Sequence, residues 1–211
     1  MMPDFRLYAI TGENFHPGRS LLEVMEEAIQ GGADIIQLRD KTSHKDELLQ
    51  KAKALRALTR KYGIPFIVND HVELALETDA DGIHLGQGDM PILQARQRVG
   101  NKIIGISTHA VEEALLAGQQ GADYIGAGPV YATQTKADVV APVGLSYIRE
   151  VAEKSRVPFV AIGGIKLSNV DEVIRAGATR ICAVSEIVGS ENVAGTCRAF
   201  LAKLDQGGQG V

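Results

Sequence analysis

Short apolar runs alternate with longer stretches of helical periodicity along the whole chain, and this alternation restricts the possible folds more than any other feature. The runs are too short and too uniformly apolar to be half-exposed strands, and such runs are typical of parallel strands covered on both faces. We expect eight strands, at residues 7–11, 35–39, 66–69, 82–85, 103–107, 124–127, 159–162 and 181–185.

The intervening segments carry helix start and stop signals. Ser20-Leu21-Leu22-Glu23 has the spacing of a capping box. Ser43-His44-Lys45-Asp46 and Ser168-Asn169-Val170-Asp171 open two further helices, with Ser168 as the expected cap. Glycines then end helices at Gly31-Gly32 and Gly177.

Eight β-then-α units at roughly 25 residues each fit the short end of the range for a (β/α)₈ TIM barrel. We therefore predict an α/β chain forming one such barrel over residues 1–205, with a flexible tail over 206–211. An open doubly wound sheet is the alternative. It is disfavoured because no Gly-x-Gly-x-x-Gly turn follows the first strand.

Composition excludes several classes of function. The 26 acidic and 22 basic residues give a net charge of −4, which argues against nucleic-acid binding. No apolar run approaches the roughly 20 residues that span a bilayer, so no membrane partner is expected. The segment after Met1 lacks the features of a signal peptide, and Cys182 and Cys197 are too few for a disulfide framework. We expect a cytoplasmic protein with both thiols reduced.

Basic residues fall where several of the predicted strands end, which is the face that carries chemistry in this barrel class. Arg39 and Lys41 follow the second strand, and Lys136 lies in the loop after the sixth. Three cations at one mouth favour binding of a phosphate or pyrophosphate, with the guanidinium able to hold two oxygens. Arg39 and Asp40 could instead form a buried structural ion pair.

Two carboxylates occupy equivalent positions. Asp70 follows the third predicted strand and Asp89 follows the fourth. Carboxylates beside a phosphate site require a cation between them, and one or two carboxylates with phosphate oxygens and water typically hold Mg²⁺. The alternative for each is a helix cap, since helical segments follow both.

The turn Gly163-Gly164 after the seventh strand predicts a second anion site, because glycine lets backbone amides approach a monophosphate closely. A tight packing turn is the structural alternative. His84 and His109 are expected to be a hydrogen-bonded core residue and a loop residue, respectively. Two anionic groups at one mouth indicate two substrates or one long one.

Several of these segments together resemble the thiamin-phosphate synthase family. The resemblance covers almost the whole chain, and the Thr-x-Thr-Lys segment combined with Arg-x-Lys and Asn-Asp is its most specific part. The segments are Gln37-Leu38-Arg39-Asp40-Lys41, Asn69-Asp70, Gly86-Gln87-Gly88-Asp89, Gly105-Ile106-Ser107-Thr108-His109, Gly128-Pro129-Val130-Tyr131, Thr133-Gln134-Thr135-Lys136 and Ile162-Gly163-Gly164-Ile165.

The resemblance implies an enzyme, a transferase, that couples 4-amino-2-methyl-5-pyrimidinylmethyl diphosphate to a thiazole phosphate by a dissociative route and releases pyrophosphate. It implies Mg²⁺ at Asp70 and Asp89, and catalytic roles for Arg39, Lys41, Ser107 and Lys136. It further implies that the diphosphate contacts Gln37, Arg39, Lys41, Asn69, Ser107 and Lys136, and that the thiazole phosphate contacts Thr133, Thr135, Gly164, Val184 and Ser185.

Two positions depart from the family pattern. Gly12 follows Thr11 where relatives often carry Asp, and Gly88 stands where an acidic residue is common. Neither removes an implied metal ligand. The rival functions are a thiazole tautomerase or regulator of the same barrel family and a metal-free sugar-phosphate isomerase. The loop over residues 132–143 is the candidate to close over the mouth.

Overall fold

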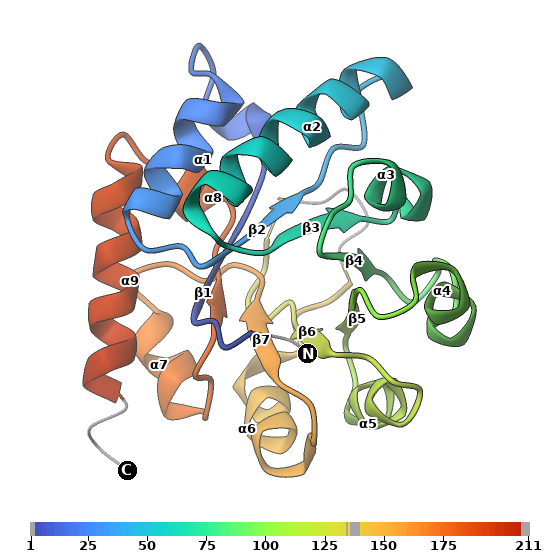
Figure 1. Ribbon diagram of the computed structural model, residues 1–211. Coiled ribbons are helices and arrows are strands. Elements are labelled where there is room, and N and C mark those ends of the chain that lie inside the picture. The colour runs from blue at the N-terminus through green and yellow to red at the C-terminus, as the bar shows by residue number, and fades with distance from the viewer. Residues whose placement is uncertain (1–2, 134, 136–139, 208–211) are drawn as a thin grey trace.

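The computed structural model describes residues 3–133, 135 and 140–207, and in these ranges all eight predicted strands are present. They close into one parallel barrel in sequence order (Figure 1). The strands are β1 (Leu7–Ile10), β2 (Ile35–Leu38), β3 (Phe66–Asn69), β4 (Gly82–Leu85), β5 (Ile103–Thr108), β6 (Tyr124–Ala127), β7 (Phe159–Ile162) and β8 (Ile181–Cys182).

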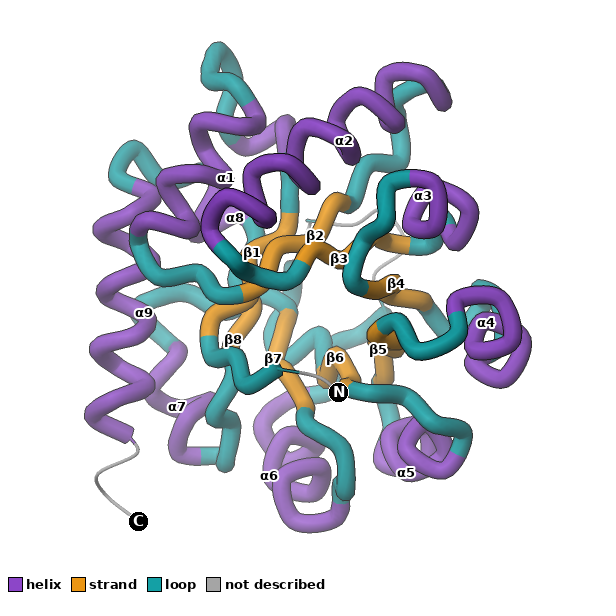
Figure 2. The backbone as a smooth tube through the Cα atoms, viewed as in Figure 1, coloured by secondary structure: helices purple, strands orange, loops and turns teal. Residues whose placement is uncertain are grey.

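Helices surround the strands on the outside (Figure 2). They are α1 (Leu21–Gln30), α2 (Lys45–Tyr62), α3 (Val72–Glu77), α4 (Ile92–Val99), α5 (Val111–Gln119), α6 (Gly144–Lys154), α7 (Val170–Arg175), α8 (Ser185–Val188) and α9 (Val193–Gly207), with a short 3₁₀ helix η1 (Glu13–Phe15). The chain is thus a single-domain (β/α)₈ barrel, as predicted.

Pairing of the last strand with the first closes the sheet. Leu7 and Tyr8 of β1 pair in parallel with Ile181 and Cys182 of β8. Because all eight strands are parallel, their carboxyl ends lie at the same end of the barrel and their loops can share one cavity there.

Side chains fill the inside of the barrel. Residues that alternate along the strands point inward, and two tyrosines dominate this interior: Tyr8 is 1% exposed and Tyr124 is fully buried. Phe5 lies edge-on to both rings, with ring centroids 5.9 and 6.0 Å away. The interior formed by the described strands is therefore a packed core.

Helix boundaries confirm part of the capping prediction. The Ser20 hydroxyl accepts from the backbone N–H of Glu23, and the Glu23 carboxylate accepts from the N–H of Ser20. The prediction for Ser168 is wrong, because Asn169 is the cap residue of α7. The Asn169 carboxamide does not bond to the first turn of the helix; its oxygen accepts from the backbone N–H of Lys166 in the preceding loop.

The two chain segments near the C-terminus differ in extent from the predictions. β8 stops at Cys182, and Ser185 is the first residue of α8 rather than the end of a strand. The chain turns at Val184, whose φ and ψ are both −79° and so are not extended. Helix α9 continues to Gly207, two residues past the expected end of the barrel at 205; residues 208–211 lie outside the described residues.

None of the described helices combines the length and apolar character that crossing a bilayer requires. Both cysteines are buried and free of disulfide bonds.

The close approach of β5 to Tyr124 yields a stability prediction. A Cβ at Gly105 would lie 2.1 Å from Cζ of Tyr124, inside the packed barrel. Gly105→Ala is therefore expected to lower the free energy of unfolding by about 2–3 kcal/mol in a urea titration, since overpacking a core forces shifts. Gly118→Ala, in α5, is the control, because a Cβ at Gly118 would lie 3.6 Å from the Val157 side chain, an ordinary contact distance. This substitution should be neutral or should stabilise the protein by up to about 1 kcal/mol. Equal stabilities of the two variants would contradict the packing account.

Candidate active site

A cavity of 890 Å³ lies at the carboxyl ends of the strands. It is bordered by residues from the loops after most strands, far apart in the sequence. The sequence-predicted site residues that line it are Arg39, Lys41, Asn69, Asp70, Asp89, Ser107, Thr133, Thr135, Gly164, Val184 and Ser185.

Two predicted site residues are not placed on its wall. Gln37 is 2% exposed in the barrel interior, where its Nε2 donates to the Tyr8 hydroxyl at 2.7 Å. Lys136 lies outside the described residues, as does much of the loop that we expected to close the mouth.

Asp70 is held in an uncommon backbone conformation at the cavity. Its φ is +61°, a region that residues other than glycine rarely occupy. Its carboxylate forms an ion pair with Lys41, and α3 begins after His71, so the Asp70 side chain is not the cap of that helix. Backbone strain of this kind is found where a side chain must be held in place.

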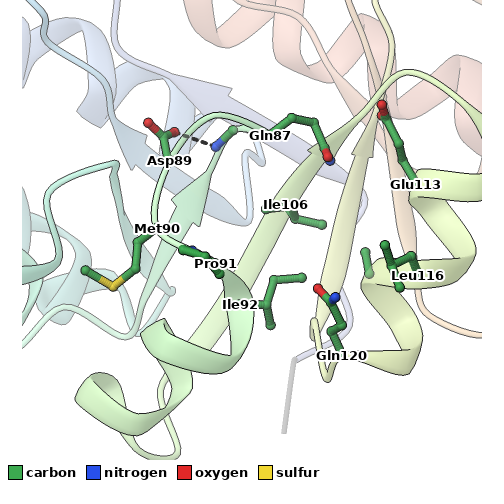
Figure 3. A pocket seen from close by; sticks show the side chains of 11 residues that line it. Gln87, Asp89, Met90, Pro91, Ile92, Ile106, Glu113, Leu116 and Gln120 are labelled. Carbon is green, nitrogen blue, oxygen red and sulfur yellow. Dashed lines mark hydrogen bonds between the residues drawn. The ribbon is translucent and has the colours of Figure 1, made fainter.

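Asp89 faces the same cavity from the β4–α4 loop. Its Oδ2 accepts from the backbone N–H of Gly86 at 2.6 Å, the bond drawn in Figure 3. Pro91 is the cap residue of α4, so Asp89 does not cap that helix either. A smaller cavity of 170 Å³ lies beside Asp89 between α4 and α5 (Figure 3).

The loop that carries Arg39 and Lys41 is anchored at its start and at its centre. At its start, the Thr11 hydroxyl accepts from the Arg39 N–H at 2.9 Å and donates to the Arg39 carbonyl at 3.0 Å. At its centre, Asp40 accepts from the backbone N–H groups of Thr42 and Ser43 and pairs with Lys51 on α2 at 2.9 Å. Asp40 thus pairs with a helix lysine and fixes the loop.

The electrostatics of Asp40 follow from these partners. Its side chain is 8% exposed. Burial alone would raise the pKa of Asp40, but Lys51 and the two backbone amides outweigh that effect and hold the pKa well below its usual range. The carboxylate is therefore ionised at neutral pH and pairs with Lys51.

The Gly163-Gly164 turn forms another side of the cavity. Both residues have positive φ, +99° and +64°, and a Cβ would lie 2.4 Å from Pro129 Cα at Gly163 and 2.7 Å from the Ala132 carbonyl oxygen at Gly164. Only glycine fits both positions. The structure thus gives the turn a packing role and also places it at the cavity, beside the Thr133 and Thr135 hydroxyls, which are 2.9 Å apart.

The cavity is also lined by residues that sequence reasoning did not assign to the site, among them Phe15, His109 and Lys166. Lys166 adds an exposed cation two residues beyond Gly164, so its spacing from the glycine turn could have indicated it. His109 was expected to be a loop residue, and its Nδ1 lies 2.5 Å from the Gly128 carbonyl oxygen. Phe15 belongs to η1, a short helix that no sequence pattern predicted.

His84 is a hydrogen-bonded core residue, as predicted. It is 7% exposed, with Nδ1 2.9 Å from the Tyr124 hydroxyl and Nε2 2.9 Å from the Ser107 hydroxyl.

The fold and this cavity together define a class: a TIM barrel whose mouth combines cations, two carboxylates and a glycine turn, an arrangement suited to phosphorylated small molecules. The family model described as thiamine monophosphate synthase matches residues 7–187. The chain belongs to this family. The activity that follows from this membership is that of a thiamine-phosphate synthase, a transferase of thiamine biosynthesis.

Individual relatives agree along the whole chain. The chain is 63% identical to the thiamine-phosphate synthase of Halalkalibacterium halodurans, over 99% of this chain and all of that protein. It is 59% identical to the thiamine-phosphate synthase of Shouchella clausii, over 99% of this chain and all of that protein. The solved thiamine phosphate pyrophosphorylase of Pyrococcus furiosus superposes with a TM-score of 0.88 at 39% identity, over 96% of both chains. A 3-hexulose-6-phosphate synthase at 19% identity, with a TM-score of 0.67, shares the fold.

The low pKa of Asp40 gives a pH-dependent prediction. Asp40→Asn keeps an oxygen for the backbone amides but removes the charge that Lys51 pairs with, and should cost about 1–2 kcal/mol of unfolding free energy at pH 7. The ionised carboxylate stabilises the fold fully above its unfolded pKa of about 3.9 and loses that effect as pH falls through the lower folded value. The difference in unfolding free energy between wild type and Asp40→Asn, measured by urea unfolding, should therefore persist down to about pH 4 and become smaller only below that pH.

Glu150→Gln is the control, because the Glu150–Lys154 pair is half exposed on both sides. It should change the free energy by less than about 0.5 kcal/mol at any pH. If the difference in unfolding free energy between wild type and Asp40→Asn already became smaller between pH 7 and pH 5, the lowered pKa of Asp40 would be contradicted.

Proposed function

We propose that the chain couples 4-amino-2-methyl-5-pyrimidinylmethyl diphosphate to a thiazole phosphate in the presence of Mg²⁺, producing thiamin phosphate and pyrophosphate. One observation carries the proposal: the two basic residues Arg39 and Lys41, the carboxylates Asp70 and Asp89 and the Gly163-Gly164 turn line one cavity. A single mouth with two anion-binding sides accommodates two phosphorylated substrates.

The diphosphate is assigned to the side of the cavity bordered by the loops after β2, β3 and β5. Arg39 can bind two oxygens in a fork, and Lys41 supplies a second charge. Asn69, which is 7% exposed, and the Ser107 hydroxyl add neutral hydrogen-bonding groups on the same cavity. Lys136 belongs to this set by family resemblance.

The donor set fits Mg²⁺. Both carboxylates present hard oxygen ligands at one cavity, and the described residues contain no cluster of three or more His, Cys, Asp or Glu side chains that would suit a metal with an all-protein shell. Two carboxylates completed by substrate phosphate oxygens and water are the usual arrangement for this ion. Asp70 and Asp89 would hold it, and bound Mg²⁺ would neutralise charge that develops on the leaving pyrophosphate.

The thiazole phosphate is assigned to the opposite side, at Gly164 and the Val184–Ser185 turn. The positive-φ glycines allow backbone groups to approach an anion without side-chain interference, and the Thr133 and Thr135 hydroxyls adjoin them. Lys166, at the same turn, contributes charge for the monophosphate.

The chemistry we propose needs no protein nucleophile. Arg39 and Lys41 stabilise the departing pyrophosphate, the pyrimidine amino group stabilises the methylene cation, and the thiazole nitrogen attacks that carbon. Among the described cavity residues the only imidazole is that of His109, whose Nδ1 is directed at a backbone carbonyl. The role of the protein in this scheme is to position two substrates and to screen charge.

A direct assay tests the function. Purified protein is mixed with the pyrimidine diphosphate, thiazole phosphate and MgCl₂, and thiamin phosphate is detected by fluorescence after oxidation; parallel reactions omit one component each. Product is expected only in the complete mixture. Folded protein that makes no product would overturn the proposal and favour the tautomerase or regulator branch, whereas product without Mg²⁺ would overturn the metal assignment.

Substitution of one carboxylate tests the metal site. Asp70→Asn preserves the shape of the side chain, and asparagine tolerates positive φ, so the fold should survive. Loss of the charge should lower kcat/KM by about 100-fold or more, with partial recovery at higher MgCl₂, because metal affinity falls.

Asp79→Asn is the matched control. Asp79 is the other non-glycine residue with positive φ among those described, at +49°, and it pairs with Arg60 and Lys102 away from the cavity. It should retain near-normal kcat/KM. Comparable losses in both variants would show that backbone disturbance, rather than metal binding, explains the Asp70 result.

A further inference from the structure

Buried hydrogen bonds form a continuous chain through the barrel interior and reach the cavity wall. Gln37 Nε2 lies 2.7 Å from the Tyr8 hydroxyl, which lies 2.8 Å from that of Tyr124. The chain continues to His84 Nδ1 at 2.9 Å, and from His84 Nε2 to the Ser107 hydroxyl at 2.9 Å. We call these five residues the interior hydrogen-bond chain.

The proton order along this chain follows from counting donors. The carboxamide of Gln37 donates to Tyr8. Burial raises the pKa of both tyrosines far above the usual value, so each keeps its single proton. Tyr8 accepts from Gln37, and Tyr124 is the other hydrogen-bond partner of its hydroxyl among the described residues. The order that leaves no buried hydroxyl proton unpaired is therefore donation from Tyr8 to Tyr124 and from Tyr124 to His84.

The order of donors sets which ring nitrogen of His84 carries the proton, and this in turn sets what His84 offers to Ser107. Because Nδ1 of His84 accepts from Tyr124, the neutral ring carries its proton on Nε2, which then donates to the Ser107 oxygen. The single hydroxyl proton of Ser107 is then not needed for the bond to His84. Since Ser107 lines the cavity, this proton can be donated to a group bound there.

We propose that the interior hydrogen-bond chain orients the Ser107 hydroxyl as a fixed donor toward a diphosphate oxygen, with His84 as the positioning residue. This inference rests on the proposed function for the identity of the ligand. With the opposite proton order, Ser107 would donate to His84 and present lone pairs to an anion. A donor fixed before the ligand arrives requires no reorganisation when charge develops on the leaving group.

The proton position on His84 is measured directly by ¹⁵N NMR of protein labelled at the histidine ring nitrogens, without ligand. The Nε2–H form is expected for His84 in the wild type. Observation of the Nδ1–H form or of the doubly protonated ring would overturn the proposal. This readout does not depend on activity, so it holds or fails separately from the proposed function.

Breaking one link tests the effect on binding. Tyr124→Phe removes the donor to Nδ1 and should leave His84 in a mixture of neutral forms. Binding of pyrophosphate with MgCl₂, measured by calorimetry, should weaken about 10-fold, the effect of losing one hydrogen bond to a charged group. Unchanged affinity in folded Tyr124→Phe protein would overturn the proposal. Should this variant not fold, Tyr8→Phe interrupts the preceding link and is expected to disturb the His84 proton position and the affinity in the same direction.

A double-mutant comparison shows whether the chain acts through the serine. In a Ser107→Ala background, Tyr124→Phe should cause no further loss of pyrophosphate affinity, because the oriented donor is already gone. An additive loss would mean that Tyr124 supports the cavity generally.

Tyr147→Phe is the matched control. Tyr147 is also buried, at 6% exposed, and its hydroxyl donates to Thr108 at 2.7 Å, outside the chain. It should leave both the His84 proton position and pyrophosphate affinity unchanged, and an equal loss of affinity in this variant would overturn the specific role of the chain.

Discussion

The parallel closure of the barrel is the constraint on which the site depends. β8 contributes only Ile181 and Cys182, yet their pairing with Leu7 and Tyr8 completes the ring. Without closure, the glycine turn after β7 would lie at one edge of an open sheet and the loop after β2 near the other. With it, the loops that carry Arg39 and Gly164 border one cavity.

The barrel interior divides into an apolar part and a polar part. Phe5 and the two tyrosine rings fill the lower interior, while the hydroxyls of those tyrosines, together with Gln37 and His84, form a hydrogen-bonded layer beneath the cavity. Burying such polar groups is unfavourable unless they are paired, and these hydrogen bonds pair them with one another. The same contacts that stabilise the core therefore determine which hydrogen-bonding groups reach the cavity.

Charge is arranged by the loops rather than by the strands. Asp40 is neutralised by Lys51 of α2, and this pair anchors the loop of Arg39 and Lys41 from outside the cavity. Asp70 pairs with Lys41. A metal bound by Asp70 would compete with that ion pair and leave Lys41 available for a phosphate oxygen.

Much of the fold could be predicted because strand length, apolar content and helix signals are local properties of the sequence. All eight strands were found this way, whereas β8 was predicted too long because residues 183–185 are compatible with a strand and only the turn at Val184 ends it. Most predicted site residues line the cavity because strand ends in a parallel barrel converge. Gln37 was placed in the site by resemblance, and the structure gives it a buried partner, Tyr8, instead of a place on the cavity wall.

Contacts between distant residues account for what the sequence could not predict. The pairing of Lys51 with Asp40 depends on how α2 packs over the β2 loop. The link from Tyr8 to Tyr124 spans 116 residues and requires the barrel to be closed before it exists. No local pattern encodes either contact.

The central claim is that one mouth holds a metal-bound pyrophosphate and, on the opposite side, a monophosphate. A crystal structure of the protein with MgCl₂, pyrophosphate and thiamin phosphate tests it most directly. The account predicts Mg²⁺ between Asp70 and Asp89, pyrophosphate at Arg39 and Lys41, and the phosphate of the product at Gly164. A metal bound away from both carboxylates, or both anions on the same side of the cavity, would contradict it.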